Sequence, residues 1–301
     1  MCLIAFAIAA RPDLQLVIAS NRDEFWARPT LPLQAWTLPS GKAVYSGLDL
    51  QAGGTWIGLA QDGRVAMLTN VRSGSPEAAQ RSRGELVTGW LDAGSDWEDW
   101  LSGFDPLQYG GFNLVLGDLV RCRWAWVSNR PSGLRVSRDL DELPALPDGW
   151  HGRSLAPGLY GLSNAALDTP WPKTVALKQA LQRHLADGAR PENPAPLLDA
   201  LLHRMPAPDA ELPVAGVAAD IDRALSSAFV HAPEMRYGTR SSMIVHWRAD
   251  GRLDVREWTH EADSSTPPGN QQDSRWPLTG SRYSCLESVI APVGAQSSQL
   301  R

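Results

Sequence analysis

Cys2, the second residue of the chain, is the first candidate for chemistry. A small residue after the initiator methionine usually permits removal of Met1, which would leave a thiol and a free α-amine on Cys2. The ordinary pKa is roughly 7.7–8.0 for an α-amine and about 8.5 for a thiol, so the amine is suited to act as a general base for the thiol. The alternative is that Cys2 is only a small residue of a strand, and its position alone leaves both interpretations open.

A polar run, Ser20-Asn21-Arg22-Asp23-Glu24, comes directly after an apolar stretch. Residues 3–9 and 16–19 predict the two strands of a hairpin with a turn at 11–14, and the polar run itself predicts a turn. Hairpin pairing brings the end of the second strand beside the start of the first, so the run is expected near Cys2. The alternative is a solvated charged turn.

Two charged residues in this run, Arg22 and Asp23, offer complementary chemistry. Arg22 can hold a thiolate or a substrate carbonyl, because its guanidinium carries only donors and a positive charge. Asp23 can bind the α-ammonium of Cys2 or the amine of a substrate. We therefore expect both side chains beside the thiol.

Amide side chains stand at the ends of two further predicted strands. Asn70 follows the strand at 65–69, and Asn164 follows the strand at 158–162. Amide donors at strand ends can form an oxyanion hole, and Arg240, at the start of a later strand, can supply a second cation. The alternatives are asparagines in turns and an ordinary exposed arginine.

The order of predicted elements favours a layered α+β fold, in which strands, then helices, then strands form two sheets with helices outside. The remaining strands are expected at 112–117, 121–127, 242–247 and 253–258, with a possible extension at 134–136, and the helices at 85–92, 97–101, 174–185, 194–202 and 220–229. Residues 27–52 look like a loop. The Gly53-Gly54 pair permits a tight turn or a close backbone approach. We expect one domain over 1–261 and a mostly disordered tail over 262–301.

Composition excludes several classes of protein. The formal net charge of −5 over 301 residues gives no electrostatic footprint for nucleic acid, although Arg72, Arg81 and Arg83 could form a local basic patch. The apolar run after Cys2 is far too short to span a bilayer.

The three cysteines suit a reducing compartment, so we expect a cytoplasmic protein, and none lies in a zinc-binding pattern. The 13 tryptophans favour core packing, or alternatively an aromatic-lined pocket.

Taken in order, these motifs resemble the NRDE family, also called the transport and Golgi organisation protein 2 family. The resemblance covers residues 1 to about 260 and is carried by Met1-Cys2, Ser20-Asn21-Arg22-Asp23-Glu24, Gly54-Thr55-Trp56, Thr69-Asn70, Gly161-Leu162-Ser163-Asn164 and Tyr237-Gly238-Thr239-Arg240-Ser241. That family in turn resembles the N-terminal-nucleophile cysteine hydrolases that cleave conjugated bile acids and penicillin V. The resemblance implies a four-layer αββα sandwich.

The resemblance also implies roles for individual residues. Cys2 would be the nucleophile and its own base, with Arg22 and Asp23 as partners of its thiol and amine. Asn70 and Asn164 would be oxyanion donors, and Arg240 a supporting cation. Residues expected to contact the substrate are Asn21, Glu24, Trp56 and Tyr237.

Two functional hypotheses follow for a small-molecule substrate or ligand. The first is an amidohydrolase that cleaves a linear C–N amide bond through Cys2 and requires no cofactor. The second is a non-enzymatic carrier of haem, an acyl lipid or acyl-CoA that uses the same cleft, since eukaryotic members of the family are linked to haem trafficking and to lipid or acyl-CoA handling. A third hypothesis, a structural or partner-binding protein, has no feature to support it beyond the tail.

Overall fold

The computed structural model describes residues 2–72, 79–131, 146–212 and 217–260, and the backbone of 282–289. One sheet, called sheet A, has the order β10-β1-β2-β12-β13-β14, with β11 paired to β12. Its strands are β1 (Cys2–Arg11), β2 (Leu14–Phe25), β10 (Gly158–Leu162), β11 (His231–Ala232), β12 (Tyr237–Arg248), β13 (Arg252–Thr259) and β14 (Arg282–Val289).

Sheet B has the order β3-β4-β5-β6-β7-β8-β9, so its strands pair in the order in which they occur in the chain. They are β3 (Thr30–Thr37), β4 (Ala43–Asp49), β5 (Ile57–Ala60), β6 (Arg64–Asn70), β7 (Phe112–Asp118), β8 (Arg123–Ser128) and β9 (His151–Ser154). Both sheets are antiparallel throughout the described strands.

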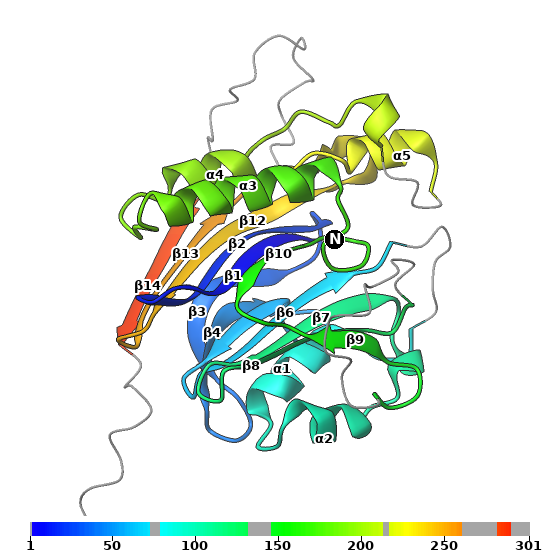
Figure 1. The fold of residues 1–301 in the computed structure, drawn as a ribbon. Helices are drawn as coiled ribbons and strands as arrows, with labels where there is room; N and C mark the ends of the chain where they lie inside the picture. The colour runs from blue at the N-terminus through cyan, green and yellow to red at the C-terminus, as the bar shows by residue number, and fades with distance from the viewer. Residues whose placement is uncertain (1, 73–78, 132–145, 213–216, 261–281, 290–301) are drawn as a thin grey trace, which may run out of the picture.

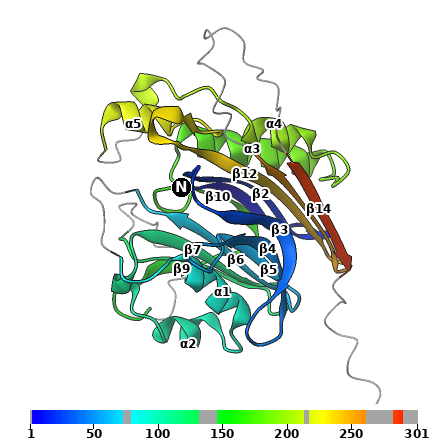
Figure 2. The ribbon, with the colours of Figure 1, turned by 180° about the vertical axis from the view of Figure 1, so that it is seen from behind.

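Helices cover the outer face of each sheet (Figures 1 and 2). The α-helices are α1 (Gly84–Asp92), α2 (Trp97–Ser102), α3 (Pro172–Ala186), α4 (Ala195–Leu201) and α5 (Ala219–Ala224), and the 3₁₀ helices are η1 (Pro106–Gln108), η2 (Asp209–Glu211) and η3 (Pro233–Met235). Helices α3, α4 and α5 lie on the side of sheet A, and α1 and α2 lie on the side of sheet B. The expected four-layer αββα fold is confirmed.

Strand β1 is buried on both faces, which explains its nearly continuous apolar sequence. Ile4, Phe6 and Ile8 belong to the core between the two sheets. The alternate residues Leu3 and Ala5 pack instead in the core beneath α3 and α4. This alternation also divides the polar residues of the neighbouring strand between the two faces, as described below.

Tryptophans fill the cores on both sides of sheet B. Trp124, Trp126 and Trp247 pack between the sheets, whereas Trp90, Trp97 and Trp100 pack between sheet B and its helices. Trp258 packs against the core beneath α3 and α4. For these residues the core interpretation is confirmed, because their rings pack in the cores and do not line a pocket.

Several predicted elements differ from the structure. Residues 27–52 are not a loop but contain β3 and β4. The Pro32-containing strand β3 lies at the edge of sheet B and carries a bulge between Leu31 and Gln34, the setting in which a strand tolerates proline. The short polar strand β9, at the other edge, was also missed.

The C-terminal segment also departs from expectation. Residues 282–289 of the predicted tail form β14, which pairs along the whole of β13. The rest of 262–301, and the predicted extension at 134–136, lie outside the described residues. Among the residues described, no helix has both the length and the apolar character needed to cross a membrane.

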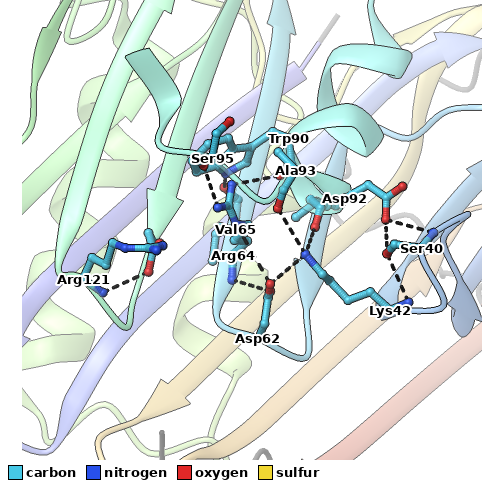
Figure 3. Close-up of polar contacts among 12 residues, drawn as sticks. Ser40, Lys42, Asp62, Arg64, Val65, Trp90, Asp92, Ala93, Ser95 and Arg121 are labelled. Atoms are coloured by element: carbon cyan, nitrogen blue, oxygen red, sulfur yellow. Dashed lines mark hydrogen bonds and ion pairs between the residues drawn. The ribbon is translucent and has the colours of Figure 1, made fainter. Parts of the chain in front are cut away.

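A buried arginine joins sheet B to its helices. The guanidinium of Arg64, in β6, lies 4.1 Å from the ring centroid of Trp90 and donates to the backbone oxygens of Trp90 (3.4 Å) and Ser95 (2.7 Å). Its Nε lies 4.0 Å from the carboxylate of Asp62, which also pairs with Lys42 (Figure 3). Both terminal nitrogens of this buried guanidinium therefore have a hydrogen-bond acceptor, and its Nε has an ion-pair partner.

The Gly54 position tests the packing of α1 against sheet B. A Cβ at Gly54 would lie 2.5 Å from the backbone carbon of Gly84, at the start of α1, and backbone cannot move aside easily. We expect Gly54→Ala to lower the free energy of unfolding by about 1–3 kcal/mol, measured by urea denaturation. Gly94→Ala is the matched control, because a Cβ there meets nothing within 4 Å. Equal stability of the two variants would contradict the close approach.

Candidate active site

Cys2 opens β1 and pairs directly with Arg22 of β2. Because Cys2 lies two residues before Ile4 in the same strand, its side chain points to the face between the sheets, with the residue 8% exposed. Its backbone oxygen accepts a hydrogen bond of 3.1 Å from the Ser163 hydroxyl. The predicted hairpin is confirmed. The polar run, however, is not a turn: β2 continues through it to Phe25, because β12 pairs with it on the other side.

Arg22 is held beside Cys2 by an aromatic ring and a carboxylate. Its guanidinium carbon lies 4.3 Å from the ring centroid of Trp56, just before β5 of sheet B, and its Nη2 lies 3.6 Å from Oε2 of Glu24. Arg22 is 5% exposed, whereas the Glu24 side chain is 24% exposed. The attraction between a cation and a tryptophan face offsets part of the cost of removing the cation from water. Sheet B thus positions a cation of sheet A next to the thiol.

Burial raises the pKa of the Cys2 thiol, and the carboxylates of Asp23 and Glu24 raise it further. The Arg22 charge acts in the opposite direction. The thiol is therefore protonated near neutral pH. A nucleophilic role for Cys2 requires a base that removes this proton during the reaction.

Asp23 points to the opposite face of β2 from Arg22, as alternation in a strand requires. Its Oδ1 accepts a hydrogen bond of 2.7 Å from the Thr239 hydroxyl, and its backbone oxygen accepts one of 2.7 Å from the Tyr237 hydroxyl. Burial raises the pKa of the Asp23 carboxyl, while the nearby Lys173 ammonium opposes that rise. Tyr237 therefore supports the backbone of Asp23 from within the fold.

The two predicted asparagines meet at the end of β10. The Asn164 side chain donates a hydrogen bond of 3.0 Å to the backbone oxygen of Asn70 and accepts one of 3.2 Å from Ser163. Asn164 is buried and Asn70 is partly exposed. Because Ser163 also binds the Cys2 carbonyl, the structure brings Asn70, Asn164 and Cys2 to one place.

Two other predicted site residues are engaged within the fold. The Asn21 amide donates to the backbone oxygens of Leu201 (2.7 Å) and Ala228 (2.8 Å), so both of its protons are used to hold the helix layer. Arg240 lies in a bulge of β12 and donates to the backbone oxygens of Phe25 (3.2 Å) and Trp26 (2.7 Å). Arg240 thus closes the end of β2 beyond Glu24, near Arg22.

Sequence reasoning missed a buried lysine. Lys173, in the first turn of α3, is 5% exposed and donates a hydrogen bond of 2.8 Å to the backbone oxygen of Leu225. Burial lowers the pKa of its ammonium to about 8, whereas Asp23 and Cys2 act to raise it. No sequence signal separates this lysine from the solvated lysines of an ordinary amphipathic helix.

The expected basic patch does not form as a group of exposed arginines. Arg72 is buried and pairs with Asp222, with Nη1 2.5 Å from Oδ1, and both side chains are almost fully enclosed. Arg81 forms a separate ion pair with Glu85. Asp222 and the burial of Arg72 were also missed, because the two residues are far apart in the sequence.

Histidines form two buried contacts away from Cys2. His184 and His246 lie with their Nε2 atoms 2.8 Å apart. The Ser242 hydroxyl donates to Asn21 Oδ1 (2.6 Å) and lies 2.9 Å from Nε2 of His260, so His260 acts as donor to the serine rather than as its base. Among the described residues no group of His, Cys, Asp and Glu has the arrangement of a metal site.

Comparison with known proteins establishes the family. A model of the family described as Transport and Golgi organisation 2 matches residues 1–262. The chain belongs to this family. A Transport and Golgi organization protein 2 homolog from Bos taurus is 33% identical over 279 residues, covering 85% of this chain and 92% of the relative. The Drosophila melanogaster protein is 27% identical over 278 residues, covering 86% and 92%.

Solved structures with a similar chain path include hydrolases. A Caenorhabditis elegans orthologue of N-acylethanolamine-hydrolyzing acid amidase gives a TM-score of 0.42 at 10% identity, covering 67% of this chain and 85% of that one. A conjugated bile acid hydrolase from Clostridium perfringens, with Cys2 of that protein mutated to alanine, gives 0.42 at 10% identity, covering 97% and 98%. Such distant likeness says nothing about the activity of this chain.

The charge of Arg22 can be tested through the reactivity of Cys2. We expect Arg22→Met to raise the thiol pKa further, because it removes the cation that favours the thiolate. The measurement is the rate of Cys2 alkylation by iodoacetamide between pH 7 and 10, followed by peptide mass spectrometry. The midpoint should move to higher pH in the variant. Exposed Cys122, in the same samples, is the control, and an unmoved Cys2 midpoint would show that Arg22 does not act on the thiol.

Proposed function

We propose that this protein is a cytoplasmic cysteine amidohydrolase that cleaves a linear C–N amide bond, with Cys2 as its nucleophile after removal of Met1. The observation that carries the proposal is the pairing of Cys2 with Arg22 at the start of β1. It puts a buried thiol beside a cation fixed by Trp56 and Glu24, at the point where Ser163 and Asn164 end β10. A cysteine that serves only to fill space in a strand does not require a fixed cation and polar side chains beside its thiol.

The proposed reaction has two steps, and the α-amine of Cys2 serves as the base in both. In the first, the amine takes the thiol proton while Sγ attacks the amide carbon, forming an S–C bond. The C–N bond then breaks, and the proton passes to the leaving amine. In the second step, a water molecule loses a proton to the α-amine and attacks the thioester carbon, forming a C–O bond. The S–C bond then breaks, the carboxylic acid leaves, and the α-ammonium returns the proton to Sγ to restore the thiol.

Neighbouring residues have separate roles in this scheme. Arg22 stabilises the thiolate as it forms, and Asp23 stabilises the α-ammonium. The Asn164 amide donates one of its two N–H groups to the Asn70 backbone oxygen, and its second N–H group can donate to the tetrahedral oxyanion. Asn70, at the end of β6, is the second proposed donor, while Arg240 contributes positive charge from the end of β12.

The nucleophile is tested by substitution. We expect Cys2→Ala to reduce turnover of acyl-amide substrates by at least about a thousandfold, because no other group can form the thioester. Release of the amine product is the measurement, over a panel of N-acyl amino acids and N-acyl amines that wild type is first shown to cleave. Cys122→Ala is the matched control and should retain full activity. Unchanged turnover in Cys2→Ala would refute the proposal.

The intact mass of the protein tests the base. A mass lower by one methionine, in protein purified from its native type of cell, frees the Cys2 amine as the mechanism requires. A retained Met1 blocks that amine and would favour the alternative, a carrier that binds haem or an acyl lipid at the same site without cleaving it. A haem titration followed by absorbance then tests the carrier, and the absence of a saturable shift at micromolar protein would count against haem.

A further inference from the structure

Arg72 lies beside the candidate active site but has no role in the mechanism above. It follows β6 by two residues, and its backbone N–H donates a hydrogen bond of 2.8 Å to the backbone oxygen of Asn164. Its side chain is 5% exposed. Arg72 is therefore fixed next to the proposed oxyanion donors Asn70 and Asn164.

The guanidinium of Arg72 is only partly satisfied. Its Nη1 binds the Asp222 carboxylate at 2.5 Å, and its carbon lies 5.0 Å from the ring centroid of Trp171. Its Nε and Nη2, although buried, have no hydrogen-bond partner in the part of the chain that the structure describes. Leaving buried charged donors without an acceptor costs free energy that a ligand could recover.

The two nitrogens without a partner lie on the same edge of the guanidinium. The hydrogens on Nε and Nη2 point in parallel, and this edge can donate to two oxygens of one carboxylate or phosphate group at once. Arg64 shows the contrast: it is equally buried and also lies over a tryptophan ring, but its Nη1 and Nη2 both donate hydrogen bonds and its Nε lies 4.0 Å from the Asp62 carboxylate (Figure 3). Burial over a ring thus does not by itself leave this edge empty.

A second buried cation lies near Arg72. The ammonium of Lys173 is buried, and its charge and that of Arg72 repel each other, which contributes to the lowered pKa of Lys173. Lys173 follows Trp171 by two residues at the start of α3. Two buried cations close enough to repel each other favour the entry of an anion.

We propose that the Nε–Nη2 edge of Arg72, with Lys173 beside it, is a subsite for an oxyanion, a carboxylate or phosphate group, carried by the molecule that binds at Cys2. Both nitrogens are buried, so the side chains around them must shift for the oxyanion to reach the edge. The proposal names the substrate class of the proposed hydrolase as acidic amides. The assignment of a substrate class rests on the proposed function. The binding of an oxyanion at Arg72 does not depend on it.

Binding can be measured without turnover in the Cys2→Ala protein. The probes share one acyl chain and one amide: N-octanoylglycine carries a carboxylate, N-octanoylaminomethylphosphonate carries a phosphonate, and N-octanoylglycinamide is neutral. Isothermal titration calorimetry should show at least one charged probe binding about tenfold or more tightly than the neutral one, as expected for a charge-assisted two-point contact. The tighter of the two charged probes identifies the oxyanion.

Arg72→Lys, added to Cys2→Ala, keeps the positive charge beside Asp222 but removes the two-nitrogen edge. We expect it to lose about tenfold in affinity for the charged probe and to leave the neutral probe unchanged. The matched control is Arg64→Lys, which should change neither affinity. Melting temperatures of all proteins show whether each variant is folded.

The outcomes separate this inference from the proposed function. Equal binding of all three probes by the Cys2→Ala protein would overturn the subsite, and so would unchanged affinity for the charged probe in a folded Arg72→Lys variant. Selective binding that depends on Arg72 would support it even if wild type hydrolyses none of the probes. In that case only the hydrolase would fail.

Discussion

The end of β10 has to satisfy hydrogen-bonding groups from both sheets, and the position of Cys2 depends on this junction. The Ser163 hydroxyl donates to the Cys2 carbonyl in sheet A, while the Ser163 backbone oxygen accepts a bond of 2.6 Å from Thr69 in sheet B. Asn164 adds two bonds to the segment that ends β6. Since β1 pairs with β10 on one side and β2 on the other, a shift of this junction would move the thiol relative to sheet B.

Buried charge collects around this junction, whereas the cores elsewhere are mostly apolar. Arg22, Asp23, Arg72 and Lys173 are all at most 5% exposed. Removing such groups from water is costly, and apolar residues of similar size would stabilise the fold at least as well. Tryptophan faces and backbone oxygens offset part of that cost. Burial also shifts the pKa values of Asp23 and Lys173 in this cluster, a combination that is common at functional sites.

Local patterns in the sequence were enough to predict the hairpin that brings Arg22 to Cys2. A continuous apolar run, a turn and a second apolar run leave few other ways to pair. They were not enough to show that β2 continues through Asn21 and Asp23, because the polar groups of those residues are satisfied by α4 and β12, which come much later in the chain. The same holds for β3, whose proline suggests a loop until its place at a sheet edge is known.

Some residues of the site could also be predicted from the sequence, and others could not. Cys2, Asn70 and Asn164 stand at or just beyond strand ends, and Arg22 belongs to the polar run that directly follows an apolar stretch, so a pattern in the sequence can point to them. Arg72 and Lys173 could not be found in this way, since a charged residue destined for burial has the same local sequence as a solvated one. Their burial follows only from long-range contacts, with Asp222 and Leu225 respectively.

Alternation along β2 gives the site its most specific electrostatic property. Transfer of a proton from the Cys2 thiol to its own amine would create a thiolate and an ammonium on one residue, both in a buried setting where separated charges are costly. Arg22 and Asp23 are neighbours in sequence and point to opposite faces, so one strand presents a cation and an anion to the two sides of the residue paired with it. An Arg-Asp pair in a turn could rotate to neutralise itself. Held in a strand between β1 and β12, the two residues cannot pair with each other: Arg22 lies 3.6 Å from Glu24, and Asp23 accepts a hydrogen bond from Thr239 on the opposite face.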